Sequence, residues 1–161
     1  MATYFTADTH FGHGGALGFY RRPFASVAEM DAAMVANWRA VIAADDDVWH
    51  LGDFALGKHV DASTLLATLP GRKHLIAGNN DPPTPAAGWA SVQAYAELEA
   101  AGRRVVLCHY PFRTWRDGGR GAINLHGHSH GRLKPLPRQY DVGVDVRLFR
   151  PVTLEQLLGK P

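Results

Sequence analysis

The most informative feature of the sequence is an arrangement of residues that recurs five times. In each case a short apolar run ends at a small or turn residue, and side chains that can bind metal ions follow. These segments are Asp8-Thr9-His10, Gly52-Asp53, Gly78-Asn79-Asn80-Asp81, His109 and Gly127-His128-Ser129-His130. Carboxylate, amide and imidazole groups bind hard and borderline divalent cations. If the apolar runs are strands, their carboxyl ends bring these groups to one edge of a sheet, where open α/β sheets hold their sites.

The number of these groups indicates more than one metal ion. Two carboxylates, one amide and four imidazoles exceed what a four-coordinate zinc ion can bind, so two ions that share a carboxylate bridge are the economical arrangement. Each segment taken alone has an ordinary alternative. Asp8 also fits a turn cap, residues 78–81 also fit a plain turn, and His109 also fits a hydrogen-bonded core histidine.

The elements that must position these residues are predicted by periodicity and by end signals. The clearest helix starts after Phe24 and runs to about Ala44, because Ser26 and Glu29 form a capping-box pattern and apolar residues follow at intervals of three and four. A shorter helix is predicted over residues 61–69, and a last helical turn over residues 154–158. Strands are predicted at residues 2–7, 48–51, 72–77, 90–95, 103–108, 121–126 and 141–147.

This order of elements favours an α/β fold in which two packed sheets are covered by helices, because strands alternate with helices early and lie next to one another later. The chain of 161 residues is 46% hydrophobic and 20% charged, which suits a single compact domain over residues 1–161. No apolar run approaches the ~20 residues of a membrane helix, and the sequence runs from Met1 straight into a strand pattern. The expectation is a cytoplasmic protein without a membrane partner.

The positive charges are distributed unevenly, although the formal net charge is only +2. The stretch between Phe112 and Arg138 has a single acid, Asp117, against six cations: Arg113, Arg116, Arg120, Arg132, Lys134 and Arg138. The same stretch contains three of the histidines, so these cations are expected beside the metal centre, where they would attract an anionic substrate. The alternative is a pair of solvated loops rich in glycine and arginine.

The five segments, in this order, resemble the blocks of the calcineurin-like metallophosphoesterases. Their surroundings are similar to the small bacterial and phage-type members of that superfamily, and the resemblance covers nearly the whole chain. The surrounding matches are Phe11-Gly12-His13, His50-Leu51-Gly52-Asp53-Phe54, His109-Tyr110-Pro111-Phe112-Arg113 and Val142-Gly143-Val144-Asp145. The resemblance implies a four-layer α-β-β-α sandwich, with two β-sheets flanked by helices.

The resemblance also implies a metal-dependent phosphoric ester hydrolase with two divalent metal ions, which would be Mn, Fe, Ni or Zn. Asp8, His10 and His130 would bind the first ion, and Asn79, His109 and His128 the second, while Asp53 would bridge both. Two adjacent cations lower the pKa of a bridging water from ~15.7 toward neutrality, so a metal-bridging hydroxide would be the nucleophile.

One position departs from the family pattern. Members with strong phosphomonoesterase activity carry His after the metal-binding Asn, whereas this chain has Asn80. An amide cannot donate a proton as an imidazolium does, and loss of a general acid typically lowers the rate by ~100- to 10,000-fold. Small members without this His tend to be phosphodiesterases, so diesters are favoured. A phosphomonoesterase with a weak general acid, or an engineered Asn80, are the alternatives.

Asn80, Asp81 and Arg113 are the candidate catalytic residues, and Asp145 is a candidate for orienting a ligand histidine. His59, in a Gly-Lys-His loop, is expected to be exposed. The expected substrate is a small phosphate ester or a nucleotide, with nucleic-acid ends among the candidates. A non-catalytic scaffold on the same fold and a hydrolase of another bond, such as an amidohydrolase, are the rival classes. The scaffold is disfavoured because such proteins lose ligands, and the oligomeric state is left open.

Overall fold

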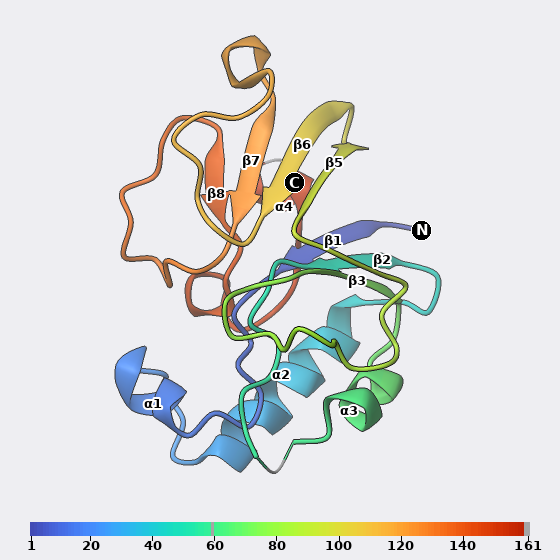
Figure 1. Ribbon diagram of the computed structural model, residues 1–161, viewed down its shortest axis with the longest axis vertical. Coiled ribbons are helices and arrows are strands. Elements are labelled where there is room, and N and C mark those ends of the chain that lie inside the picture. The colour runs from blue at the N-terminus through green and yellow to red at the C-terminus, as the bar shows by residue number, and fades with distance from the viewer. Residues whose placement is uncertain (59, 160–161) are drawn as a thin grey trace.

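The computed structural model describes residues 1–58 and 60–159 and shows two β-sheets packed against each other (Figure 1). The expectation for His59 lies outside these residues. The first sheet has the strand order β4-β3-β2-β1-β9, and the second has the order β5-β6-β7-β8. The strands are β1 (Thr3–Thr6), β2 (Asp47–His50), β3 (Arg72–Ile76), β4 (Ser91–Gln93), β5 (Tyr95–Ala100), β6 (Arg103–Cys108), β7 (Ile123–His126), β8 (Gln139–Asp141) and β9 (Val152–Thr153).

Helices flank the sheets, and the expected fold class is confirmed (Figure 1). The helices are α1 (Gly15–Phe19), α2 (Val27–Val41), α3 (Ala62–Thr68) and α4 (Leu154–Leu157). Helix α2 begins where the sequence predicts, because the Ser26 side chain accepts a hydrogen bond from the Glu29 N–H at 3.1 Å. Its buried stripe of Met30, Met34 and Trp38 packs on the outer face of the first sheet, as the periodicity predicts.

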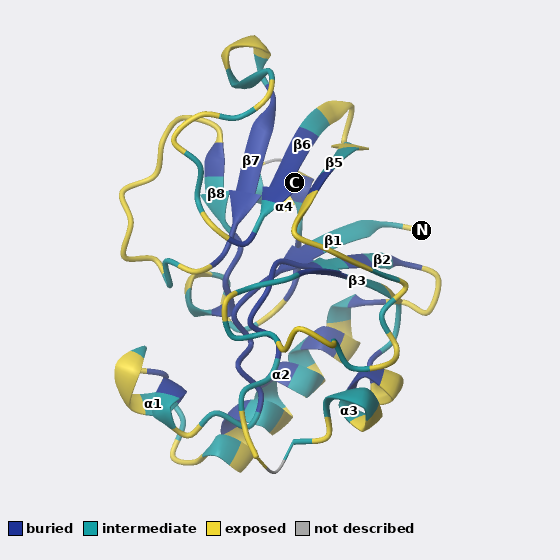
Figure 2. Ribbon diagram, viewed as in Figure 1, coloured by how far each residue is buried: buried dark blue, intermediate teal, exposed yellow. Residues whose placement is uncertain are grey.

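The main core lies between the two sheets, where the strands are buried (Figure 2). Phe5 and Leu51 from the first sheet pack with Val105, Leu107 and Leu125 from the second, and all five are 0% exposed. Burying such side chains stabilises a fold by about 1.5–3 kcal/mol each. This core fixes the position of one sheet relative to the other.

Parallel pairing brings the relevant strand ends to one edge of each sheet. In the first sheet β1, β2 and β3 are parallel, and in the second sheet β6, β7 and β8 are parallel. The loops that follow these strands therefore leave the sheets on one side. This is the arrangement that the recurring segments predict.

Two local predictions are wrong. The sequence predicts strands at residues 90–95 and 103–108 with no strand between them, whereas the structure has strand β5 at Tyr95–Ala100. It forms a hairpin with β6 through Ala101 and Gly102, both with positive φ (48° and 69°). A strand is predicted at residues 141–147, but strand β8 (Gln139–Asp141) ends at Asp141 and a 3₁₀ turn follows at Val144–Val146. The chain leaves the second sheet there because the Val144 N–H donates to the Ala7 carbonyl of the first sheet at 3.0 Å.

Within residues 1–58 and 60–159, no helix has the length and hydropathy needed to cross a bilayer.

Candidate metal centre

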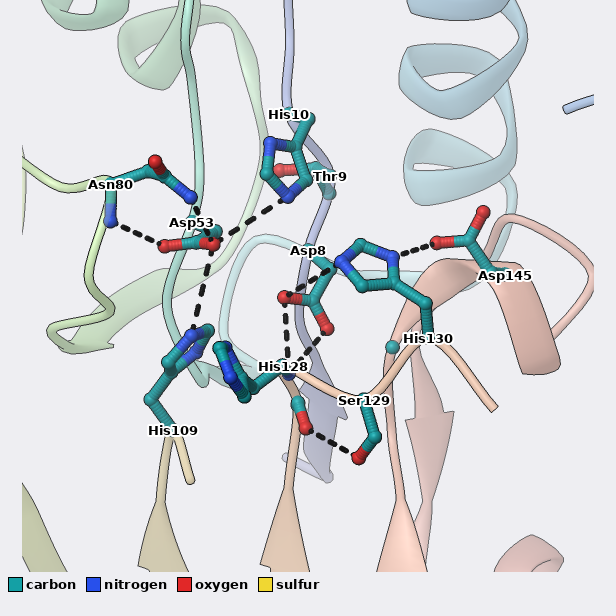
Figure 3. A network of polar contacts seen from close by, with 12 residues as sticks. Asp8, Thr9, His10, Asp53, Asn80, His109, His128, Ser129, His130 and Asp145 are labelled. Atoms are coloured by element: carbon teal, nitrogen blue, oxygen red, sulfur yellow. Dashed lines mark hydrogen bonds and ion pairs between the residues drawn. The ribbon is translucent and has the colours of Figure 1, made fainter. Parts of the chain in front are cut away.

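Loops from both sheets bring the seven expected metal ligands together. Figure 3 shows Asp8, His10, Asp53, His109, His128 and His130 side by side. Each of these residues follows a strand end. Asp8 and His10 follow β1, Asp53 follows β2, Asn79 follows β3, His109 follows β6, and His128 and His130 follow β7. The first sheet therefore contributes four of the seven residues and the second sheet contributes three.

The side chains form a continuous series of close contacts around Asp53. One Asp53 oxygen, Oδ2, lies 3.5 Å from His10 Nε2 and 3.7 Å from His109 Nε2. The Asn79 amide oxygen lies 3.0 Å from His109 Nε2 and 3.1 Å from His128 Nδ1. A single carboxylate oxygen thus lies between imidazoles of the two sheets.

Asp8 joins the remaining members of the group. The His128 backbone N–H donates to both Asp8 carboxylate oxygens, at 3.2 and 3.0 Å, and His130 Nε2 lies 4.0 Å from Asp8 Oδ1. Two sets of three ligand atoms lie within 4.8 Å of one another: Asp8, His10 and His130, and Asp8, Asp53 and His109. Either set is close enough to surround one cation.

The backbone adopts an unfavourable conformation at many of these positions. Five of the seven residues have positive φ although none is glycine: Asp8 (57°), His10 (50°), Asp53 (58°), His128 (65°) and His130 (47°). A left-handed conformation at a non-glycine residue destabilises the chain by about 1–3 kcal/mol, and such residues cluster at ligand sites. The strain is local, and its result is that these side chains converge on one point.

The glycine before His128 is required by close packing. A Cβ atom at Gly127 would lie 2.7 Å from Asp8 Oδ2, closer than van der Waals contact allows. Only glycine permits the His128 N–H to reach the Asp8 carboxylate. This explains physically why glycine precedes the His-Ser-His segment.

Hydrogen bonds to the outer ring nitrogens fix the orientation of two histidines. His109 Nδ1 lies 2.7 Å from the Leu51 carbonyl oxygen, and His130 Nδ1 lies 2.7 Å from Asp145 Oδ2. Because Nδ1 donates in both cases, Nε2 keeps its lone pair and points toward the carboxylates. Metal-binding histidines have this arrangement in general.

Arg22 holds Asp145 from behind. Its Nε and one terminal nitrogen each lie 2.9 Å from an Asp145 oxygen, and its terminal nitrogens also donate to the carbonyls of Asp8 and Thr9, at 2.6 and 2.8 Å. Arg22 is only 4% exposed. One buried guanidinium therefore links the His130 side chain, through Asp145, to the strained backbone at Asp8.

The electrostatics of the centre favour a bound cation. Burial, together with the nearby carboxylates Asp141 and Asp53, raises the pKa of Asp8 well above its ordinary value. Burial alone would raise the pKa of Asp53, but hydrogen bonds from Asn80 keep it below its ordinary value. Burial lowers the pKa of His10 to about 3, so its imidazole is neutral. Metal ions bind neutral imidazoles and ionised carboxylates. A cation would offset the repulsion from Asp141 and Asp53 that raises the pKa of Asp8.

His10 provides a direct test of whether a metal ion fits. The residue is 0% exposed, and neither of its ring nitrogens has a hydrogen-bond partner among the described residues. Buried polar atoms are normally paired, so the His10 ring requires a partner that side chains do not supply. A divalent cation beside Asp8 and Asp53 would supply a partner for His10 Nε2, the nitrogen that lies 3.5 Å from Asp53 Oδ2.

The chain matches the calcineurin-like phosphoesterase superfamily domain over residues 1–146. The chain belongs to this superfamily. It is 30% identical to an uncharacterized protein of Methanocaldococcus jannaschii, with 96% of this chain and 88% of that protein covered. It is 31% identical to the gene 66 protein of Mycobacterium phage L5, with 89% and 86% covered. A crystal structure of a protein of unknown function from Aquifex aeolicus has a TM-score of 0.75 at 22% identity, with 98% and 97% covered, which supports the fold.

Asn80 and Asp81, two of the candidate catalytic residues of this phosphoesterase-family chain, both contact Asp53. Asn80 donates two hydrogen bonds to the Asp53 carboxylate, from its backbone N–H at 2.9 Å and from its side-chain Nδ2 at 2.7 Å. The Asp81 carboxylate accepts from the backbone N–H groups of Asp53, Phe54 and Gly78, at 2.7, 3.0 and 2.7 Å. Asn80 thus touches a metal-ligand candidate directly, whereas Asp81 holds the two loops that carry Asp53 and Asn80.

Arg113 lies in a different environment. It is exposed and lines a cavity of about 260 Å³ together with Trp115 and Leu136. No hydrogen bond within the described part of the chain joins it to the seven ligand candidates. A catalytic role for Arg113 stays a prediction.

Most of the cations in residues 112–138 do not gather at the metal centre, contrary to the expectation. Arg116 and Arg120 lie 4.0 and 3.7 Å from Asp117, and Arg138 donates to the Gly118 carbonyl. The 3₁₀ turn at Gly118–Arg120 lies beyond the amino ends of β6 and β7, at the opposite end of the second sheet (Figure 1). Arg132 is the exception, because its guanidinium lies 5.7 Å from the Tyr20 ring centroid.

Two residues beside the centre escaped the sequence reasoning. The Tyr20 ring stacks on His130 at 3.5 Å between centroids and 7° between planes. Arg22 is two residues further along the chain. Both occur in an ordinary-looking Phe-Tyr-Arg-Arg stretch, and no motif distinguishes a buried arginine there from an exposed one.

Proposed function

We propose that the protein hydrolyses phosphate esters, with a preference for phosphodiesters, by means of two divalent metal ions. The observation that carries this proposal is the position of Asp53 Oδ2, which lies 3.5 Å from His10 Nε2 and 3.7 Å from His109 Nε2. A carboxylate oxygen between imidazoles of two ligand groups is suited to bridge two ions. The membership of the superfamily supports the hydrolase class.

In this proposal the ligands divide into two groups around Asp53. Asp8, His10 and His130 would hold the first ion, and Asn79, His109 and His128 the second. Once bound, the ions would supply an activated water nucleophile and positive charge for the phosphoryl oxygens. Nitrogen and oxygen ligands suit Mn²⁺, Fe, Ni²⁺ or Zn²⁺. The protein's own part is to orient His109 and His130 through their outer nitrogens and to keep His10 neutral by burial.

The preference for diesters is based on Asn80. Its Nδ2 donates to Asp53 at 2.7 Å, so the amide holds the bridging carboxylate and has no acidic proton for a leaving group. Substrates whose leaving group departs without protonation are least affected by the absence of a general acid at position 80. A phosphomonoesterase with a weak general acid is the alternative within the same chemistry.

The test is turnover of two chromogenic esters by purified protein loaded with Mn²⁺, Fe²⁺, Ni²⁺ or Zn²⁺. We expect bis-p-nitrophenyl phosphate to be hydrolysed faster than p-nitrophenyl phosphate, with loss of both activities after treatment with a chelator. Asn80→His should raise the rate for an alkyl monoester such as glycerol 2-phosphate relative to the rate for bis-p-nitrophenyl phosphate, because an alkoxide leaving group requires a proton and p-nitrophenolate does not. If Asn80→His leaves both rates unchanged, this position does not set the preference.

One further outcome would contradict the proposal. Protein that binds two metal equivalents but hydrolyses neither ester would favour a scaffold on the same fold. Asp53→Asn is the matched control, because it removes the bridging charge with almost no change in shape and should abolish turnover.

A further inference from the structure

The metal centre is open to solvent at Asn79 and His128. Asp8 and His10 are 0% exposed, whereas Asn79 and His128 are exposed. The buried pair belongs to the first ligand group, and the exposed pair belongs to the second. A substrate therefore reaches the centre past Asn79 and His128.

An aromatic ring stands at this open side. Tyr110 directly follows His109 and is 45% exposed. Its ring centroid lies 5.0 Å from that of His109 and 4.8 Å from that of His128, with interplanar angles of 76° and 65°. Two imidazoles thus fix the ring at the point where a substituent of the phosphate must pass.

We propose that Tyr110 is the stacking surface for a nucleobase, so that the substrate of the centre is a nucleotide phosphodiester. This inference rests on the proposed phosphoesterase function. A flat exposed ring next to a phosphate-binding centre suits a planar base one sugar away from the reacting phosphate, because bases stack on aromatic side chains regardless of sequence. An alkyl or glycerol ester gains little from a single flat ring.

Tyr95 is a suitable control residue for Tyr110. It is also a tyrosine, it is similarly exposed at 42%, and it lies next to the same strand, since it pairs with Cys108. Its hydroxyl donates to Glu97 at 2.7 Å, and its ring lies 6.1 Å from Phe112. No ring contact within the described residues joins Tyr95 to a ligand histidine.

The experiment compares two diesters that share one leaving group: thymidine 5′-p-nitrophenyl phosphate and ethyl p-nitrophenyl phosphate. With Mn²⁺-loaded protein, Tyr110→Ala should lower kcat/KM for the thymidine ester by about 5- to 150-fold, the range for loss of one base stack. The ethyl ester should change by less than about two-fold. Tyr110→Phe keeps the ring and should retain the rate, and Tyr95→Ala should behave as the wild-type protein.

Calorimetric binding provides a readout that does not depend on turnover. Tyr110→Ala should weaken the binding of thymidine 5′-monophosphate by the same factor and leave the binding of ethyl phosphate unchanged. If the wild-type protein hydrolyses both esters but Tyr110→Ala lowers both equally, or lowers neither, the nucleobase assignment is wrong. If the wild-type protein hydrolyses neither ester with any of the metal ions, the phosphoesterase proposal itself is wrong.

Discussion

Replacement of Arg22 by methionine should destabilise the protein strongly, although Arg22 is not a metal-ligand candidate. Arg22 is 4% exposed and donates two hydrogen bonds to the Asp145 carboxylate and one each to the carbonyls of Asp8 and Thr9. Methionine fills a similar volume, so the change removes the charge and the hydrogen bonds with little loss of packing. The two Asp145 carboxylate oxygens and the carbonyls of Asp8 and Thr9 would then all lose this hydrogen-bond donor.

The magnitude follows from the state in which Asp145 is left. Burial would raise the pKa of Asp145, and hydrogen bonds from His130 and Arg22 keep it below its ordinary value. Removal of one partner of a buried ion pair typically lowers the free energy of unfolding by about 3–5 kcal/mol. Since Asp145 also orients His130, metal affinity should fall by about 10- to 100-fold, as for other changes behind a metal ligand.

Two measurements check this expectation. Urea unfolding in the presence of a chelator gives the free energy of unfolding without metal, and competition with a chromogenic chelator gives the metal affinity. Arg39→Met is the matched control, because Arg39 is exposed and its one hydrogen bond among the described residues goes to the Thr68 carbonyl. It should change the free energy of unfolding by less than about 0.5 kcal/mol.

One outcome would contradict the expected role of Arg22. Arg22→Met with an unchanged urea midpoint and an unchanged metal affinity would mean that Asp145 finds another partner. A double-mutant cycle with Asp145→Asn measures the coupling directly, and we expect the double variant to be more stable than the two single losses predict. Additive losses would show that the pair does not act as a unit.

Three further predictions concern the centre and its surroundings. Addition of Mn²⁺ to metal-free protein at about 100 times the dissociation constant should stabilise it by about 2.7 kcal/mol for each bound ion. Asp53→Asn should abolish most of the resulting rise in Tm, and an equal rise in the variant would contradict the bridging role. Asp81→Ala should lower the free energy of unfolding of metal-free protein, measured by urea titration, by at least the ~1.5–3 kcal/mol of one hydrogen bond to a charged group. The reason is that the Asp81 carboxylate accepts hydrogen bonds from three backbone N–H groups. A smaller loss would show that water replaces the carboxylate as acceptor. Burial lowers the pKa of His50 to about 3, so between about pH 6 and 3 the unfolded chain binds a proton at His50 that the folded chain does not, and stability is lost as the pH falls. His50→Gln should therefore reduce the change in the free energy of unfolding of metal-free protein by up to about 1.4 kcal/mol per pH unit in this range. An unchanged pH dependence would mean that folded His50 is protonated.

The sequence was sufficient to predict the elements whose physical causes are local. Helix α2 could be predicted because the sequence itself contains both its cap at Ser26 and the spacing of its buried residues Met30, Met34 and Trp38. The convergence of the seven ligand candidates could be predicted because parallel strands end at a common edge. In both cases a short-range pattern determines the geometry.

The features that escaped prediction depend on distant residues. Strand β5 consists of Glu and Ala as much as of good strand formers, and its pairing with β6 decides its conformation. The turn after β8 is set by the contact of Val144 with Ala7, more than a hundred residues away. Arg22 is buried because Asp145 lies opposite it, and no pattern around position 22 could indicate this.

The origin of the ligands in two separate sheets has a consequence for how the chain matures. Asp8, Asp53 and Asn79 come from the first half of the sequence, and His109, His128 and His130 come from the second half, while β9 must return from residues Val152–Thr153 to complete the first sheet beside β1. Contacts of such long sequence separation form late in folding, because closing the intervening loops is entropically unfavourable. A chain emerging from the ribosome cannot complete the first sheet until residues Val152–Thr153 have been made, so a half-synthesised protein lacks the assembled group of ligand candidates.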